Sequence, residues 1–362
     1  MQVRHIFVGI DLGDKNSVAR IALDREKSER FKFFNNRAGR VRLFKELKNR
    51  ALAAGGARIV MAYEASSCGF ILHDEAIPHG TACYVLSPTK MEKSVEQRKH
   101  KNDDRDAEDI LEKLRAHVLA GNRLPTVWIP DLKTRDDREL VRTRIELGEK
   151  QTQLKTQVQM LLKRQGLEKP EGLGAGWTVA YRQWLMEISE SDQQGWGLRQ
   201  ALASLLRQLA AIEAELDGLE ELMKALAARP HHKPIVEELK KEHGVGLLTA
   251  LVYRTEIGYA GRFRRGRQMG KFGGLTPTSN ESGQQPDRKG HISRQGSRRL
   301  RKILCQASWV HIRHDREAAA VFQKLVERNP KKKKIAIVAI MRRLSIRLWH
   351  RMRKAELEMA TD

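Results

Sequence analysis

The stretch that decides the fold lies near the start of the chain: HIFVGI at residues 5–10, followed directly by Asp11. A short apolar run rich in β-branched residues predicts a buried strand. VARIAL at 18–23 alternates apolar and polar residues and predicts the second strand of a hairpin, and FKFF at 31–34 predicts a third. The chain therefore begins with a sheet whose first strand ends in a carboxylate.

A helix and two further strands are predicted next. Apolar residues near helical spacing predict a helix over 38–54. RIVMAYE at 58–64 predicts a strand that ends in Glu64, and TACYVL at 81–86 predicts a strand closed by a Ser-Pro pair. A strand-rich start followed by strand–helix alternation predicts a mixed α/β sheet.

Beyond two prolines at 125–130, which mark a boundary, long helices are predicted. In the first, leucine recurs every seven residues, at Leu140, Leu147, Leu154 and Leu161. In the second, apolar residues step by four and three at Leu198, Leu202, Leu205, Leu209, Ile212, Leu216, Leu219, Met223 and Leu226. Such heptads predict a coiled coil, as an antiparallel pair within one chain or as a dimer between chains. A plain core helix of a bundle is the alternative.

The charge of the chain points to a nucleic-acid partner. Its 362 residues include 68 Lys and Arg against 45 Asp and Glu, a formal net charge of +23. The excess is concentrated at 262–302 and 331–354, which is the distribution expected of a face that binds phosphate backbone. The glycine-rich run at 270–296 within the first block is predicted to be a loop. A merely solvated basic surface is the alternative interpretation.

Several classes of protein are disfavoured. The three cysteines form no Cys-x-x-Cys pair, which argues against a disulfide scaffold or a cysteine zinc site and favours a reducing cytoplasm. No stretch has the length of a membrane span or the pattern of a signal peptide. The histidine pairs His231–His232 and His311–His314 are interpreted as surface or core residues, and no metal role is assigned to them.

Four carboxylates predict a metal site. Asp11 and Glu64 end predicted strands, while Asp103 and Asp106 open a predicted helix at a spacing that places both on one face. Carboxylate oxygens are the ligands that Mg²⁺ prefers, and such ions can activate an attacking oxygen in phosphoryl transfer. Any one of these residues taken alone is better explained as a cap or a surface acid. The combination in a basic chain favours the metal site.

The first motif also permits a rival hypothesis. VGIDLGDKNSV at 8–18 resembles the first phosphate loop of the actin-like ATPases and sugar kinases. That family would require a second Asp-x-Gly loop and a Gly-Gly adenosine motif. No second Asp-x-Gly occurs, and the Gly-Gly pairs at 55–56 and 273–274 stand in the wrong settings. The ATPase interpretation is therefore set aside.

The motifs together resemble the DEDD transposases of bacterial insertion sequences, relatives of pilin-gene invertases known as bridge-RNA-guided recombinases. KNDDRDA at 101–107 is similar to their Lys-Thr-Asp-x-x-Asp-Ala motif, with Asn102 in place of threonine and a charged pair where an Arg-apolar pair is usual. RELVRTRIEL at 138–147 is similar to the start of their coiled coil. GVGLLTALVYRTEIG at 244–258 and the segment from 271 to 307 are similar to their C-terminal domain.

The resemblance implies a ribonuclease-H-like, RuvC-like domain in which Asp11, Glu64, Asp103 and Asp106 hold Mg²⁺. It also implies a serine nucleophile in a Ser-Gly pair that follows a Gly-Leu-x-Pro turn, which here is Ser282. Metal or a nearby cation can activate such a serine, and the glycine after it lets the backbone approach a phosphate. The competing serines are Ser279, Ser293 and Ser297.

The resemblance further implies a structured guide RNA that pairs with donor and target DNA, and a homo-oligomer, a dimer or tetramer. We expect a RuvC-like α/β domain at 1–128, a helical coiled-coil insertion at 129–230 and a mostly helical transposase domain at 231–362. The expected function is cutting and rejoining of DNA through a serine-linked intermediate in the bacterial cytoplasm. The alternatives are a RuvC-like endonuclease that hydrolyses with water and a non-catalytic nucleic-acid-binding scaffold.

Overall fold

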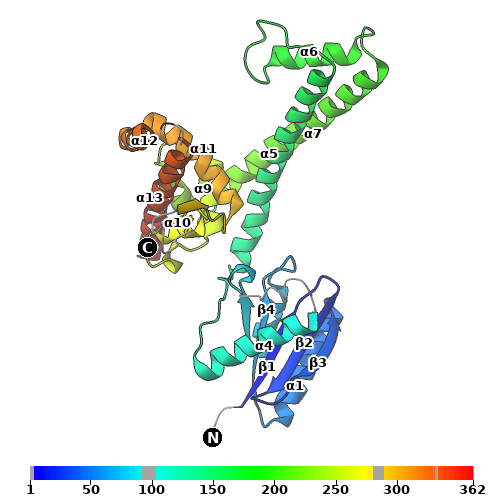
Figure 1. Cartoon of the computed structure of the whole chain (residues 1–362), viewed down its shortest axis with the longest axis vertical. Coiled ribbons are helices and arrows are strands. Elements are labelled where there is room, and N and C mark those ends of the chain that lie inside the picture. The colour runs from blue at the N-terminus through cyan, green and yellow to red at the C-terminus, as the bar shows by residue number, and fades with distance from the viewer. Residues whose placement is uncertain (1–3, 92–102, 280–288, 329, 331–332, 362) are drawn as a thin grey trace. The chain divides into compact units, whose positions relative to one another are not determined.

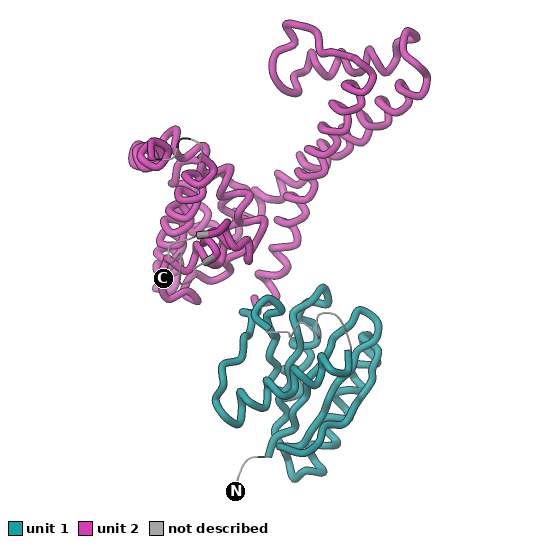
Figure 2. The backbone as a smooth tube through the Cα atoms, in the orientation of Figure 1, with its two compact units in different colours: residues 1–129 teal, residues 130–362 magenta. Residues whose placement is uncertain are grey.

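In the computed structural model of the chain, the described residues are 4–91, 103–279, 289–328, 330 and 333–361. The chain folds into two compact units, residues 1–129 (unit 1) and residues 130–362 (unit 2), which Figure 2 distinguishes by colour. Figure 1 labels the main elements within each unit. Of the helices that the structure describes, none is long and apolar enough to cross a membrane.

Unit 1 is built on a five-stranded mixed sheet in the order β3-β2-β1-β4-β5. The strands are β1 (His5–Asp11), β2 (Asn16–Leu23), β3 (Glu29–Phe34), β4 (Arg58–Glu64) and β5 (Ala82–Leu86). The first three strands form two antiparallel hairpin pairs, whereas β4 lies parallel to both β1 and β5. Parallel neighbours need a crossover connection, which helices supply between β3 and β4 and between β4 and β5.

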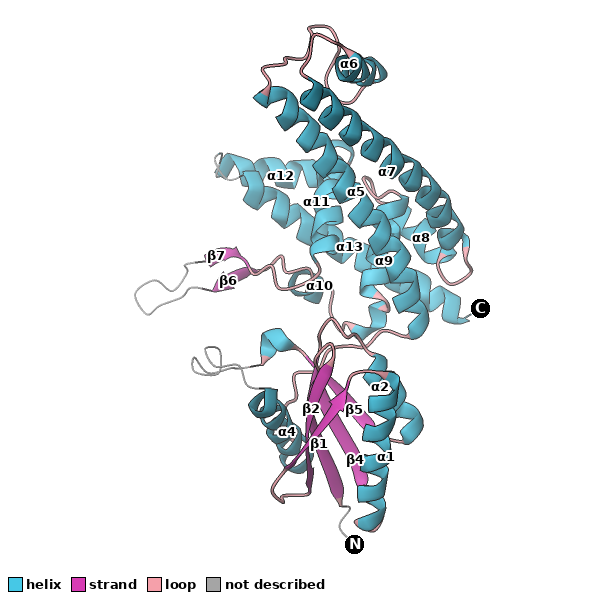
Figure 3. Ribbon diagram, turned by 90° about the vertical axis from the view of Figure 1, so that its right-hand side faces the viewer, coloured by secondary structure: helices cyan, strands magenta, loops and turns pink. Residues whose placement is uncertain are grey.

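Helices cover both faces of this sheet, as Figure 3 shows. One face packs on α1 (Arg37–Ala53) and α2 (Ile71–Ala76), which is followed by the 3-10 helix η1 (Ile77–His79). The other face packs on α4 (Asp103–Ala120). A further 3-10 helix, η2 (Pro88–Lys90), follows β5. Because side chains alternate along a strand, β1, β2, β4 and β5 each supply residues to both cores, whereas β3 supplies only the core beneath α1.

Unit 2 begins with two long helices that pack antiparallel to each other. They are α5 (Leu132–Arg164) and α7 (Trp196–Ala228), joined through α6 (Val179–Glu190). The direction follows from the ion pairs between them, since Arg144 meets Glu220 while Lys155, later in α5, meets Glu213, earlier in α7. The pairing of the two predicted heptad helices is therefore seen within one chain; whether they supercoil stays a prediction.

The rest of unit 2 is a helical bundle that carries a small two-stranded sheet. Its elements are α8 (Lys233–Lys240), α9 (Leu247–Ile257), η3 (Ala260–Arg262), α10 (Gln268–Phe272), β6 (Pro277–Ser279), β7 (Lys289–Ile292), α11 (Arg298–His314), α12 (Arg316–Arg328) and α13 (Lys333–Thr361). α13 crosses the core of the bundle, where Trp349 donates a hydrogen bond to the carbonyl of Ala260 at 3.0 Å. The hydroxyl of Tyr253 donates to the carbonyl of Ser345 at 2.6 Å.

The predicted strands and long helices are present within a few residues of their expected bounds. Two features were not predicted. α6 lies in the Gly- and Trp-containing segment between the heptad helices, and the run 270–296, expected to be a loop, contains the end of α10 and the β6–β7 pair. Both elements are short and lie beside several glycines, so their local pattern gives little periodicity to read.

Candidate active site

Asp11 and Glu64 lie at the same end of two neighbouring parallel strands. The register pairs Gly9 with Ala62 and Ile10 with Tyr63, so the two acids are the next residues along each strand. Adjacent strands lie about 4.8 Å apart, which brings the two backbones close at this edge. By strand alternation both acids share the face of Gly9 and Ala62, which is the face that α4 covers.

The helix that carries Asp103 and Asp106 approaches this edge unusually closely. A Cβ atom placed on Gly9 would lie 2.2 Å from the carbonyl oxygen of Ala107 and 2.4 Å from the amide nitrogen of Leu111, so only glycine fits. α4 therefore rests directly on β1, two residues before Asp11. The first turn of α4, with Asp103 and Asp106, is held beside the strand ends as a result.

Asp104 in the same turn has a different use. Its carboxylate forms ion pairs with Arg20 on β2 and, at 3.2 Å, with Arg30 on β3. Arg20 also lies 3.4 Å from Glu108, one turn further along α4. These ion pairs connect α4 to strands β2 and β3. Asp104 therefore has a structural role beside the predicted site.

The structure brings the three elements together without closing the carboxylates into a tight cluster. Among the described residues, the groups of three or more ligand atoms that lie within 4.8 Å of one another are both in unit 2, and neither contains Asp11, Glu64, Asp103 or Asp106. Like charges repel, and carboxylates close in when a cation offsets their charge. The donor set consists of carboxylate oxygens alone, which fits a hard divalent ion such as Mg²⁺.

A hydrogen-bond network that sequence reasoning missed supports the turn after Asp11. The side-chain amide of Asn35 donates to the carbonyl of Gly13 at 2.9 Å, and the side-chain oxygen of Asn35 accepts from Arg40 at 3.2 Å. Arg40 is buried and donates to both carboxylate oxygens of Glu75, at 2.7 and 3.0 Å. This chain links β3, α1 and α2 to the turn, and so fixes the backbone beside the site.

The predicted nucleophile Ser282 lies outside the described residues. The strands on either side are β6 and β7. They join a compact segment, here called the β6–β7 base, which consists of Gly273, Gly274, Gly296 and Arg301. Gly274 has a φ of 64°, and a Cβ on Gly296 would lie 2.1 Å from the carbonyl of Phe272, so both positions require glycine. Arg301 donates to the carbonyls of Gly273 at 3.2 Å and Gly296 at 3.0 Å. The predicted Gly-Leu-Thr-Pro turn is thus tightly packed.

Of the competing serines, Ser297 has a structural role. Its hydroxyl accepts the amide hydrogen of Leu300 at 3.1 Å and caps the start of α11. The backbone of Ser293 pairs with Thr276 at 2.8 Å beside the β6–β7 base, and Ser279 is the last residue of β6. The cap at Ser297 makes that residue the weakest of the three competitors.

The first predicted basic block presents several exposed cations. Among its described residues, the exposed basic ones are Arg264, Arg265, Arg267, Lys271, Arg294 and Arg298. Burial, and then the charges of Arg294 and Arg298, lower the pKa of Arg301. Arg294 and Arg298 thus lie near enough to Arg301 to repel its charge, and an anion such as a DNA phosphate would offset that repulsion.

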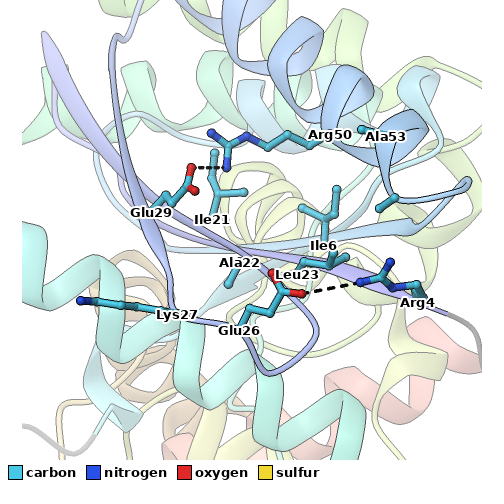
Figure 4. Close-up of a pocket in the computed structure, with 11 residues that line it drawn as sticks. Arg4, Ile6, Ile21, Ala22, Leu23, Glu26, Lys27, Glu29, Arg50 and Ala53 are labelled. Carbon is cyan, nitrogen blue, oxygen red and sulfur yellow. Dashed lines mark ion pairs between the residues drawn. The ribbon is translucent and has the colours of Figure 1, made fainter.

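A pocket in unit 1 is not part of this site. Figure 4 shows its lining, which includes Arg4 and Ile6 at the start of β1 and therefore lies at the opposite end of that strand from Asp11. Its acids are engaged with arginines, Glu29 with Arg50 at 2.8 Å and Glu26 with Arg4 at 3.7 Å. The pocket therefore lies apart from the four predicted carboxylates.

Two transposase family profiles match the chain. Residues 8–165 match a profile described as Transposase, of the DEDD type of IS110 elements, and this range contains all four candidate carboxylates. Residues 236–323 match the profile described as Transposase IS116/IS110/IS902 family, and this range contains Ser282.

Three bacterial relatives with transposase names are similar to the chain over most of its length. The Sinorhizobium fredii protein y4qE is 28% identical over 315 residues, which is 85% of this chain and 72% of the relative. Its counterpart y4rJ is 28% identical over 333 residues, or 86% and 82%. The transposase for insertion sequence element IS1111A of Coxiella burnetii is 28% identical over 237 residues, or 65% and 61%.

The two profiles and the three relatives identify the chain as a DNA-processing enzyme of the transposase class. The chain therefore contains transposase domains of the IS110/IS116/IS902 family. Its partner is accordingly DNA, and the DEDD type of the first profile implies the use of divalent metal. The actin-like ATPase hypothesis has no match among these relatives.

Proposed function

We propose that this transposase cuts and rejoins DNA at a Mg²⁺ centre held by Asp11, Glu64, Asp103 and Asp106, with Ser282 as the nucleophile. The observation that carries the metal centre is the close contact of α4 with Gly9 of β1, because it holds the two acids of the helix beside the two acids of the strands. A divalent ion bound there would supply charge for a phosphoryl transfer.

In the proposed reaction the Ser282 oxygen forms a bond to a DNA phosphorus while the bond from that phosphorus to one deoxyribose oxygen breaks. The serine proton passes through solvent to the departing deoxyribose oxygen. In the second half, a hydroxyl of another DNA strand attacks the serine phosphodiester and restores the serine. The number of phosphodiester bonds is conserved, so no external energy source is required. The four carboxylates would hold the divalent ion against which the phosphate is oriented, and the cations near Arg301 would hold the DNA backbone.

Hydrolysis by water at the same carboxylates is the second candidate, and the DEDD match favours it, because that family type suggests a RuvC-like nuclease mechanism. It would require Asp11 but leave Ser282 without a role. A search for a covalent adduct separates the two. The full chain would be expressed with the DNA that flanks its own gene, denatured, digested and searched by mass spectrometry for a nucleotide-linked peptide.

We expect an adduct on Ser282 that is absent in Ser282→Ala and retained in the control Ser279→Ala. Cleaved DNA without any adduct would instead support water as the nucleophile. An adduct on a different serine would retain the covalent mechanism but reject the assignment of Ser282. Loss of cleavage in Asp11→Asn with DNA binding retained would exclude a non-catalytic scaffold.

We further propose that a structured RNA guides the reaction, that the active form is a dimer or tetramer, and that the three regions 1–128, 129–230 and 231–362 act as separate functional parts. The support is the family resemblance together with the basic surface of unit 2, which suits an RNA backbone as well as DNA. RNA sequencing of the purified full chain and light scattering of the complex test these points. Recovery of random cellular RNA alone would reject a dedicated guide.

A further inference from the structure

Three side chains of unit 2 meet at the base of the α5–α7 pair. Asp137 lies near the start of α5, and His231 and His232 lie in the turn between α7 and α8. The Nε2 atom of His232 lies 2.9 Å from Asp137 Oδ2, and that of His231 lies 3.3 Å from the same oxygen. Asp137 and His232 are buried, and the side chain of His231 is 25% exposed.

We propose that Asp137, His231 and His232 bind a divalent transition metal ion of the Zn²⁺ class. Two imidazole nitrogens and one carboxylate oxygen are a ligand set that suits zinc, whereas Mg²⁺ prefers oxygen. The site is distinct from the proposed carboxylate centre of unit 1 in residues, in unit and in the ion it would select. The proposal therefore does not depend on the DNA chemistry.

The spacing of the donor atoms fits such an ion. Zinc bonds of about 2.0–2.1 Å in tetrahedral geometry place neighbouring ligand atoms about 3.3 Å apart. The two nitrogen–oxygen distances are 2.9 and 3.3 Å, and all three donor atoms lie within 4.8 Å of one another. Small side-chain rotations would therefore complete three bonds. The exposed edge of His231 leaves room for water as the fourth ligand.

The surroundings prepare the ligands for a cation. Arg229 lies 3.2 Å from Oδ1 of Asp137, so it orients the carboxylate by one oxygen while the other faces the two imidazoles. Such a second partner is the usual support of a metal-binding carboxylate. Burial lowers the pKa of His232 to about 4, although the hydrogen bond with Asp137 opposes this shift. The ring is neutral at pH 7, which is the form that binds metal.

A second group in unit 2 provides a contrast. Glu242, His311 and Asp315 also lie close enough to share an ion. There, however, Arg347 reaches both carboxylates at 3.1 Å and already acts as their cation. At Asp137, by contrast, Arg229 contacts Oδ1, and Oδ2 faces the two imidazoles. This difference selects the Asp137 group as the metal site.

The test is metal analysis of the full-length protein. After gel filtration in zinc-containing buffer and removal of excess metal, mass spectrometry should find about one zinc per wild-type chain. Titration of chelator-treated wild type with Co²⁺ should give the visible absorption bands of a nitrogen- and oxygen-ligated ion. The substitution His231→Gln should weaken binding by more than the roughly 10- to 100-fold that follows loss of a supporting partner.

Matched variants locate the site. His314→Gln, the same change at an exposed histidine of α11, should retain the zinc, and so should Asp11→Asn in unit 1. Because His231 is partly exposed, its replacement should not prevent folding, and the Co²⁺ titration uses the wild type alone. Wild-type protein that gives no cobalt spectrum would overturn the proposal. Unchanged zinc content in His231→Gln would overturn it as well.

Discussion

The two units of the chain place acidic side chains in different structural settings. In unit 2, buried acids join helices through arginine, as Glu256 does with Arg142 at 3.0 Å and Glu242 with Arg351. In unit 1, strand register brings Asp11 and Glu64 to one edge of the sheet, and Asp103 and Asp106 lie in the first turn of α4. The residue type is the same, so position on the secondary structure, rather than composition, decides which acids are available for chemistry.

The charge balance of the two units reinforces this contrast. Unit 1 contains 23 Lys and Arg against 17 Asp and Glu, whereas unit 2 contains 45 against 28. Most of the positive excess therefore belongs to the helical unit, which suits it to hold DNA. The charges of unit 1 are nearly balanced, so fewer basic side chains would compete with a metal ion for the carboxylates there. The following experiments test this division.

The largest expected effect is that of Asp11→Asn. If the acids of unit 1 hold the metal, this change should lower DNA cleavage by more than about 100-fold while DNA binding is retained. Cleavage of a labelled DNA that carries the element ends, measured over a range of Mg²⁺ concentrations, checks the prediction. Asp104→Asn is the matched control, because Asp104 pairs with arginines and should matter far less for cleavage. Equal loss in both variants would contradict the assignment.

A smaller effect is expected from Gly9→Ala, which tests how the unit 1 site is built. The added methyl group meets the backbone of α4, so we expect a loss of about 3 kcal/mol of stability in unit 1. Hydrogen exchange of the amides of β1 and α4 would measure it. Gly218→Ala is the control, since that position on α7 is open and alanine there should slightly stabilise the helix. Normal protection of α4 in Gly9→Ala would refute the close contact.

The next effect concerns pH and unit 2. The pKa of His232 is lowered to about 4 in the folded chain, so between that value and its ordinary 6.5 the unfolded chain binds more protons. Stability should therefore fall as the pH falls, by about 2 kcal/mol from pH 7 to pH 5. The groups that face this ring are Asp137, His231, Arg229 and Arg254.

Tryptophan fluorescence suits this measurement because five of the six tryptophans lie in unit 2. Urea unfolding with a chelator present, at the two pH values, should show the loss in wild type. The variant His232→Gln should show a smaller dependence on pH. The same slope in both proteins would indicate that another group titrates.

The smallest expected effect is that of Asn35→Ala beside the unit 1 site. It removes the hydrogen bond to the Gly13 carbonyl and should cost about 1 kcal/mol of stability. Because the turn after Asp11 loosens, cleavage should need more Mg²⁺ while its rate at saturating metal changes little. Asn36→Ala, which removes only the cap of α1, is the control and should leave the metal requirement unchanged. An unchanged metal requirement in Asn35→Ala would argue against a positioning role.

The sequence could predict those strands, helices and site residues that belong to a local residue pattern. The apolar runs of β1 and β4 end in Asp11 and Glu64, and the heptads of α5 and α7 span four turns or more, so both signals are strong. The glycine inside β1 was a visible sign of close backbone contact, since glycine weakens a strand unless something approaches it. Its partner on α4 could not be read from the chain, because that contact joins residues about 100 positions apart.

The histidine pair of unit 2 shows the opposite case. From sequence, His231 and His232 were interpreted as surface or core residues, because two adjacent histidines provide no complete ligand set. The third partner, Asp137, precedes them by more than 90 residues and sits among other acids of α5 with nothing local to mark it. Only the antiparallel return of α7 along α5 brings the three side chains together.

The contact of β1 with α4 also bears on how this chain can change over generations. A one-residue insertion or deletion between Gly9 and Asp11 would turn the acid toward the opposite face of the sheet or displace the glycine from beneath the helix. Either event would damage folding and chemistry at once. Gene copies that gain such a frame-preserving insertion or deletion should therefore encode chains that do not fold. They should not encode chains that fold but are inactive.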